Sequence, residues 1–202
     1  YSDISSVEID TYLAETAAAL TVEHPDYSYL AARIKVNSLH KETPGFIIAT
    51  KNLYDDGLLR EEYFKKVMEN ADTIESIIDY DKDYTFDYFA LTTLIRAYLL
   101  KFDNKTIERP QDLWMRVTLT VTGNEFNLDK IKETYKSLSS GMYTHATPTL
   151  FNSGLKMQQL SSCFLIGMED DSIEGIFNTI KDCALISKTA GGIGMHAHNI
   201  RG

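Results

Sequence analysis

The chain has 202 residues, of which 44% are hydrophobic and 24% are charged, as in ordinary globular proteins. No apolar run approaches the roughly 20 residues that span a bilayer, and the start of the chain lacks the basic-then-apolar pattern of a signal peptide. We therefore expect a cytoplasmic protein without membrane contact. The formal net charge of −9 argues against bulk nucleic-acid binding, which needs a concentrated basic face. Both ends of the sequence look cut, so we expect a piece of a longer protein.

The first part of the chain has the apolar spacing of amphipathic helices. Residues 7–21 and 26–41 place apolar side chains at i, i+3, i+4 and i+7. The same pattern predicts four further helices over 59–70, 85–102, 110–121 and 128–139. The segment 85–102 is apolar on most faces and is expected to be buried. Gly141 is a candidate for ending the last of these helices.

Local side-chain chemistry supports two of these helices. Glu61 and Glu62 stand four residues before Lys65 and Lys66, a spacing at which opposite charges pair on a helix surface. Pro110 suits the first position of a helix, where its missing N–H is not needed.

The pattern changes after residue 142. Residues 143–152 are β-prone, and residues 158–167 read as a buried strand. A helix is expected from Asp171 to about residue 190, with Asp171 as its N-cap and Glu174 completing a capping box.

Three glycines at positions 191, 192 and 194 are expected to end that helix in a flexible loop, and residues 195–201 to form an alternating strand. A helical region over 1–142 followed by strand–helix–strand over 143–202 indicates an α+β fold whose second part opens an α/β barrel or sheet.

The two cysteines are too few for a disulfide framework and must be considered one by one. Cys163 lies in an apolar strand, where a free cysteine is most often a small core residue. Its neighbours Ser161 and Ser162 weaken that interpretation, because buried hydroxyls need partners. Cys183 lies on an apolar helix face and indicates core packing.

Other polar positions have both a structural and a functional interpretation. Asp171 and Ser172 at a helix start fit ordinary capping better than phosphate binding, although a helix N-terminus suits either. The glycine-rich stretch lacks the Lys-Ser/Thr of a P-loop. His196 and His198 share one side of the expected strand, but no third ligand has a characteristic spacing, so we predict no metal site.

Several blocks taken together are far more specific than any single signal. They are THATPTLFNSG (144–154), QLSSCFL (159–165), DDSIEGI (170–176) and SKTAGGIG (187–194), preceded by LAARI (30–34), HKET (40–43), YLLK (98–101) and ERPQ (108–111). In this order they closely resemble the large, catalytic subunit of eukaryotic-type class I ribonucleotide reductases. The resemblance covers essentially the whole chain.

The resemblance implies a helical N-terminal domain followed by the first strand–helix–strand units of a ten-stranded α/β barrel. It also implies reduction of ribonucleoside diphosphates to 2′-deoxyribonucleoside diphosphates by thiyl-radical chemistry with a redox cysteine pair. Cys163 matches one of the two thiols that deliver the electrons. Thr147 and Ser162, together with Cys163, match positions that hold the substrate.

The same family is controlled by nucleoside triphosphates. Asp171, Ser172, Ile173, Lys188 and Arg201 match positions of its allosteric effector site, where dTTP, dGTP, dATP or ATP would bind with Mg. The implied partners are a second large subunit in a homodimer, a metal-containing small subunit that supplies the radical, and thioredoxin or glutaredoxin as reductant. No cofactor is expected to bind this chain directly.

Parts of the family pattern are absent from the sequence. The second redox cysteine, the radical cysteine with its Asn and Glu neighbours, the C-terminal shuttle cysteines and most of the N-terminal ATP-binding regulatory domain are missing. We therefore expect an N-terminal fragment that is inactive alone. The alternative is a catalytically dead nucleotide-binding regulatory module, whose full-length gene would lack a downstream Asn-x-Cys-x-Glu segment.

Overall fold

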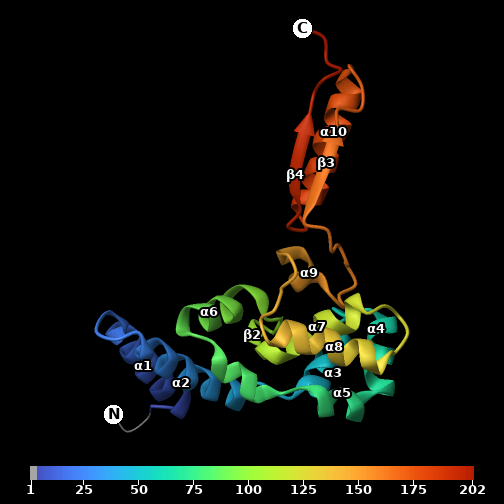
Figure 1. The fold of residues 1–202 in the computed structure, drawn as a ribbon. Helices are drawn as coiled ribbons and strands as arrows, with labels where there is room; N and C mark the ends of the chain where they lie inside the picture. Colours follow the sequence, from blue (N-terminus) through green and yellow to red (C-terminus); the bar gives the residue numbers. More distant parts are fainter. Residues whose placement is uncertain (1–3) are drawn as a thin grey trace. The chain divides into compact units, whose positions relative to one another are not determined.

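A computed structural model describes residues 4–202, which form two compact units. The first unit extends to Thr144 and includes Gly154–Lys156, and the second contains His145–Ser153 and Met157–Gly202. Each unit is considered by itself; its elements are labelled in Figure 1. Within 4–202, none of the helices has the length and apolar character needed to cross a membrane.

The first unit is almost entirely helical. Its elements are α1 (Ser6–Ala19), η1 (Leu20–Val22), α2 (Asp26–Glu42), α3 (Phe46–Asp55), α4 (Glu61–Glu69), α5 (Ala71–Ile77), η2 (Tyr80–Thr85), α6 (Tyr88–Thr93), η3 (Leu94–Tyr98), β1 (Lys101–Phe102), β2 (Lys105–Thr106), α7 (Pro110–Val121) and α8 (Leu128–Ser139). The predicted helices over 7–21, 26–41, 59–70, 110–121 and 128–139 are confirmed. Helices α3 and α5 were not predicted.

Capping residues and residues with special backbone preferences account for several helix boundaries. The Ser5 hydroxyl and the Glu8 carboxylate form a capping box at the start of α1. Pro110 is the first residue of α7, as predicted. Gly141 adopts a φ of 69° and its N–H donates to the carbonyl of Leu138, so a glycine ends α8 as expected.

The prediction of a single buried helix over 85–102 is wrong. Helix α6 ends at Thr93 and widens into the π-helical segment η3, after which the chain enters the hairpin β1–β2. Asp103 and Asn104 both have positive φ, 47° and 59°, and form the tight turn of that hairpin. Phe89 in α6 is 78% exposed, so the apolar content of this segment is not matched by burial.

The charges at the start of α4 pair differently from the prediction. The Lys65 ammonium lies 2.6 Å from the Glu61 carboxylate, which confirms one i,i+4 pair. Glu62 instead binds Arg60, at 2.7 Å. Lys66 is buried and donates to the carbonyls at the end of α7 and beyond it, at 2.8 and 2.6 Å, because an ammonium satisfies unpaired helix-end carbonyls.

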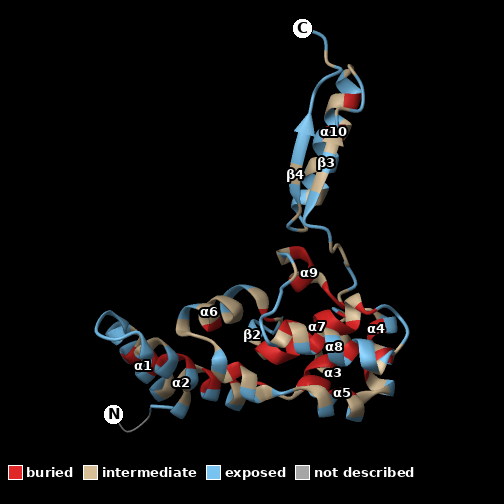
Figure 2. Ribbon diagram, in the orientation of Figure 1, coloured by how far each residue is buried: buried red, intermediate tan, exposed pale blue. Residues whose placement is uncertain are grey.

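The core of the first unit surrounds α7, where red in Figure 2 marks buried residues. Its fully or almost fully buried side chains include Leu113, Met115, Val117, Leu119, Ile131, Tyr135 and Leu138. Full burial of each large apolar side chain stabilises the fold by about 1.5–3 kcal/mol.

A buried ion pair lies within this core. The guanidinium of Arg116 donates to both carboxylate oxygens of Glu108, and both side chains are at most 3% exposed. Glu108 also accepts the N–H of Leu100, at 2.9 Å. The pair is therefore bidentate and further hydrogen-bonded, which is the geometry that a buried pair needs to offset its desolvation.

The second unit contains α9 (Thr147–Asn152), β3 (Cys163–Gly167), α10 (Ile173–Ser187) and β4 (Gly192–His196). Strands β3 and β4 are parallel, with a register running from Cys163 opposite Gly192 to Gly167 opposite His196. Helix α10 connects them and packs along the pair, in red and orange in Figure 1. The predicted strand–helix–strand order is confirmed.

Two strand predictions in the second unit are wrong. Residues 147–152 form a helix rather than a strand, because Pro148 lies in its first turn, where a missing N–H costs nothing. The ordered strand of 158–167 begins only at Cys163, and Leu165 within it is 93% exposed. Across residues 4–202, β4 is the only strand paired with β3, so the β3 side chains are not enclosed.

The glycine-rich loop prediction is also corrected. Gly192 and Gly194 belong to β4, which ends at His196 instead of continuing to residue 201. A Cβ on Gly192 would lie 3.2 Å from the carbonyl oxygen of Ser162, and one on Gly194 would lie 3.0 Å from the side chain of Leu165. The absence of a side chain at these two glycines therefore allows β4 to lie close to β3 and to the residue before it.

Replacing Glu108 with Gln is expected to lower the free energy of unfolding by about 3–5 kcal/mol, because Arg116 would remain buried without a counter-charge. Urea unfolding followed by circular dichroism measures the change. Glu61→Gln removes an exposed partner of the same chemistry and should lower the stability far less, because solvent screens the Glu61–Lys65 pair. Equal effects of the two substitutions would contradict the importance of the buried pair.

Asp112 makes stability depend on pH. Burial raises the pKa of Asp112 to about 7, although hydrogen bonds from Tyr80 and from the N–H of Arg109 oppose the shift. In the unfolded chain the pKa is about 3.9. The folded protein therefore holds this proton more tightly, and the resulting stabilisation is complete below pH ~4 and lost as the pH rises through about 7.

Urea unfolding of the wild type and of Asp112→Asn between pH 4 and 8 tests this behaviour. The stability advantage of the wild type over the variant should decline by an amount on the order of 4 kcal/mol as the pH rises, since the Asn side chain does not titrate. A difference that stays constant over this range would show that Asp112 ionises normally.

Candidate functional site

The cysteine singled out by the sequence lies at the start of a strand. Cys163 is the first residue of β3, and its thiol is free and exposed. Directly before it, the carbonyl of Ser162 accepts the N–H of Gly192, at 2.7 Å. Because Gly192 opposite Cys163 has no side chain, that neighbour does not cover the sulfur. The core-packing alternative for Cys163 is therefore wrong for this structure.

The segment before Cys163 is attached to α9. Thr149 and Asn152 of this helix donate to the carbonyls of Leu160 and Gln159. Thr147, one of the predicted substrate residues, begins the same helix. Sequence reasoning missed Thr149 and Asn152, although both lie in the block ATPTLFN, where polar residues recur on one short helix.

The predicted cap of α10 is corrected by one residue. Ser172 is the N-cap, and its hydroxyl accepts the N–H of Gly175 at 3.0 Å, so the expected capping box of Asp171 with Glu174 does not form. Only a glycine fits at position 175 in this arrangement of the helix start, because a Cβ there would lie 2.7 Å from the backbone N of Asp170. Asp171 is left free of the capping role.

Asp171 instead meets the last predicted effector residue. Its Oδ2 lies 3.5 Å from Nε of Arg201, although the two residues are 30 positions apart in the sequence. The Arg201 side chain is 83% exposed and that of Asp171 is 29% exposed. Ile173, the first residue of α10, is 75% exposed. The structure thus brings an acid, a hydroxyl, an apolar side chain and a guanidinium to one end of the strand pair.

Lys188 does not join that group. It is the C-cap of α10, at the far end of a helix of 15 residues that rises roughly 21 Å from its first residue to its last. Cys163 and Lys188 therefore lie toward the N-terminal end of the parallel strands, whereas Asp171 and Arg201 lie toward the C-terminal end. β3 separates the ends by roughly 13 Å.

The two histidines of the second unit and Cys183 do not form a further candidate site. Nδ1 of His196 lies 2.8 Å from Nδ1 of His198, so the two rings do share one side. In residues 4–202, no three His, Cys, Asp or Glu side chains are grouped so that they could hold a metal ion. Cys183 on α10 is half-buried, less enclosed than its predicted core role requires.

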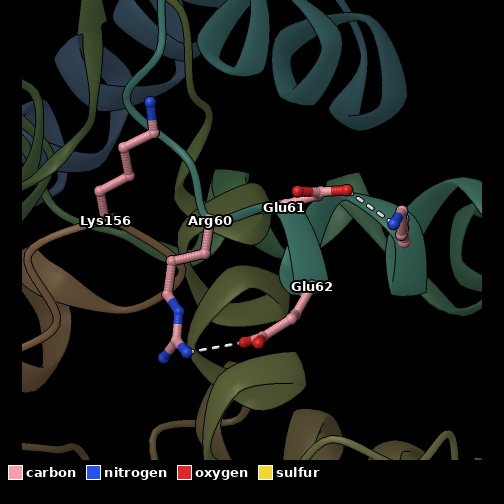
Figure 3. A pocket seen from close by; sticks show the side chains of 5 residues that line it. Arg60, Glu61, Glu62 and Lys156 are labelled. Atoms are coloured by element: carbon pink, nitrogen blue, oxygen red, sulfur yellow. Dashed lines mark hydrogen bonds and ion pairs between the residues drawn. The ribbon is translucent and has the colours of Figure 1, made fainter.

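A surface pocket in the first unit is separate from these residues. It is lined by Arg60, Glu61, Glu62, Lys65 and Lys156. Figure 3 shows that its acids are already engaged, Glu62 with Arg60 and Glu61 with a lysine of the next turn of α4. None of the catalytic, substrate or effector residues predicted from the sequence lines this pocket.

Comparison with known proteins gives matches along the whole chain. Residues 84–158 match the family model described as ribonucleotide reductase, all-alpha domain, and residues 161–202 match the one described as ribonucleotide reductase, barrel domain. The ribonucleoside-diphosphate reductase large chain 2 of Saccharomyces cerevisiae is 47% identical over the entire chain, and the large subunits of Arabidopsis thaliana and Danio rerio are 46% and 47% identical.

The chain spans about a quarter of the length of these relatives, 24% of the yeast protein and 26% of the other two. The two family models follow one another in the order helical region, then start of the barrel domain, which is the order of the two folds described above. The chain belongs to the family of ribonucleotide reductase large subunits.

Proposed function

We propose that the chain is part of a ribonucleoside-diphosphate reductase large subunit and that Cys163 is one of its redox-active thiols. The exposed thiol at the start of β3 carries this proposal, because it lies within the match to the barrel domain. Relatives 44–47% identical along the whole chain are named ribonucleoside-diphosphate reductases.

The reaction class explains why a thiol is needed. Replacing the 2′-hydroxyl of a ribonucleoside diphosphate by hydrogen releases water and consumes two electrons and two protons. Two thiols supply both when they form a disulfide. Cys163 would provide one of these thiols, and the second would come from another part of the full-length protein. The present chain alone is then inactive.

Substrate binding is assigned to the residues around this thiol. Ser162 directly precedes Cys163, and Thr147 begins a helix of the same unit. A hydroxyl both donates and accepts hydrogen bonds, so both residues suit the hydroxyl and phosphate groups of a nucleotide. Cys163 would lie at the reacting end of the bound sugar.

Effector binding is assigned to the opposite end of the strand pair. Ser172, Ile173 and Asp171 would recognise the sugar and base of dTTP, dGTP, dATP or ATP, and Arg201 would bind phosphate together with Mg. The 3.5 Å contact between Asp171 and Arg201 keeps these groups adjacent without a ligand.

Lys188 would complete the effector site from a second copy of the chain. Helix α10, which rises roughly 21 Å from Ile173 to Ser187, separates Lys188 from Asp171, so one chain does not bring the two together at one nucleotide. A two-fold contact between antiparallel α10 helices would do so. Exposed Phe177 and Ile180 on α10 provide apolar surface for such a homodimer.

The remaining partners follow from the reaction. A metal-containing small subunit would supply the radical, and thioredoxin or glutaredoxin would return the disulfide to two thiols. Both cysteines of this chain are free, which agrees with a reducing compartment such as the cytoplasm.

In the full-length protein, Cys163→Ser should abolish steady-state reduction with a dithiol reductant, because a hydroxyl cannot form the disulfide. The assay measures deoxyribonucleoside diphosphate formed per enzyme over many turnovers. Cys183→Ser, which changes the other thiol of the chain, should retain turnover. Continued turnover by the Cys163→Ser protein would disprove the redox assignment.

Asp171→Ala and Arg201→Ala in the full-length protein should each weaken effector binding about tenfold, the loss expected from one charge-assisted hydrogen bond. Isothermal titration calorimetry with dTTP measures the affinity. Lys132→Ala, an exposed cation on α8 of the helical unit, is the control and should bind normally. Unchanged affinity in both variants would place the effector elsewhere.

A further inference from the structure

We propose that Thr149 and Asn152 are positioning residues that hold the segment carrying Ser162 and Cys163. The inference rests on the proposed roles of Ser162 and Cys163 and adds two residues that act on them through the backbone. Neither side chain is assigned a contact with the substrate.

Two side chains of α9 bind two consecutive carbonyls of that segment. Oγ1 of Thr149 donates to the carbonyl of Leu160 at 2.9 Å, and Nδ2 of Asn152 donates to the carbonyl of Gln159 at 2.7 Å. Thr149 is 7% exposed. Its hydroxyl is therefore shielded from water, and the carbonyl of Leu160 would lose a protein partner if that hydroxyl were removed.

Other contacts act at the two ends of the held segment: Nε2 of Gln159 lies 3.5 Å from Oγ1 of Thr189, and the carbonyl of Ser162 accepts the N–H of Gly192. Residues 158–161 belong to no helix or strand, and the β3–β4 ladder begins only at Cys163. Within the segment, the Gln159 side chain accepts the N–H of Ser161, which orders the next residue along the chain. Fixing the carbonyls of Gln159 and Leu160 therefore determines how the backbone enters Ser162.

Helix α9 is itself ordered by local interactions. Pro148 restricts its first turn, and the fully buried Ser153 donates from its hydroxyl to the carbonyl of Thr149 at 2.6 Å. A side chain that projects from an ordered, buried helix can locate a loop more closely than a loop residue can.

The proposed reaction requires the Cys163 thiol to be held in an accurate position. A thiol that must approach one carbon of a sugar loses rate steeply when it is displaced, by up to about 100-fold for an error near 1 Å. Loss of either tether would let the 159–162 segment move and displace both the Ser162 hydroxyl and the Cys163 thiol.

The test compares variants that differ in a single donor. Thr149→Val keeps the branched shape but removes the hydroxyl, Thr149→Ser keeps the hydroxyl, and Asn152→Asp keeps the shape but replaces the amide donor. Hydrogen exchange of the peptide 157–165 is measured by mass spectrometry in the full-length protein. Exchange should become about tenfold faster in Thr149→Val and Asn152→Asp, the effect of losing one hydrogen bond, and remain within about twofold in Thr149→Ser.

The same variants are then assayed in the full-length protein. Thr149→Val should lower kcat/KM for the nucleoside diphosphate by about 10-fold or more, Thr149→Ser should restore it to within about twofold, and dTTP affinity should stay unchanged in both. A general loss of structure would instead lower effector affinity as well and would not be rescued by Ser.

Wild-type exchange and turnover in both Thr149→Val and Asn152→Asp would overturn the proposal, as would equal impairment of Thr149→Val and Thr149→Ser. The two proposals fail separately. Retained turnover in Cys163→Ser would remove the redox role, whereas the exchange rate of 157–165 still decides whether the tethers order the segment.

Discussion

The buried pair of Glu108 and Arg116 is the interaction on which the helical unit depends. Two opposite charges at most 3% exposed are stable there only because the guanidinium engages both carboxylate oxygens. Glu108 also accepts the N–H of Leu100. Through Glu108, the pair therefore connects the backbone just after η3 to Arg116 in α7. This connection sets the position of α7, on which the packing of its apolar side chains depends.

The residue next to Glu108 extends this control across the unit. Arg109 donates to the hydroxyl and the carbonyl of Thr43 at 2.9 and 2.8 Å, and to the carbonyl of His40 at 3.2 Å. Its guanidinium also lies 4.7 Å from the ring centre of Tyr80. These hydrogen bonds connect two sequence blocks that lie far apart in the chain, HKET and ERPQ. They stabilise the C-terminal end of α2.

Sequence patterns predicted the elements that local forces determine. The α8 segment has apolar periodicity, a capping Asn127 and a terminating Gly141, and its bounds agree with the prediction. The prediction of one helix over 85–102 failed because the apolar content of this segment does not reveal the hairpin turn at Asp103 and Asn104. The helix at 147–152 was missed because β propensity was weighed above the first-turn preference of proline. In both cases a single backbone constraint outweighed composition.

In the candidate site, too, local sequence predicted some features and not others. The local sequence of Cys163 favoured a packed core thiol, and only the order of several blocks pointed to chemistry, because exposure of a strand depends on which strands cover it. Conversely, only the resemblance placed Asp171 and Arg201 in one site, because no local pattern relates two residues that lie 30 positions apart. Within the second unit, Asp171 and Arg201 of the proposed effector site lie at the opposite end of β3 and β4 from Cys163. In this unit β3, β4 and α10 connect the two ends, so any coupling between these ends inside the unit would pass through these three elements.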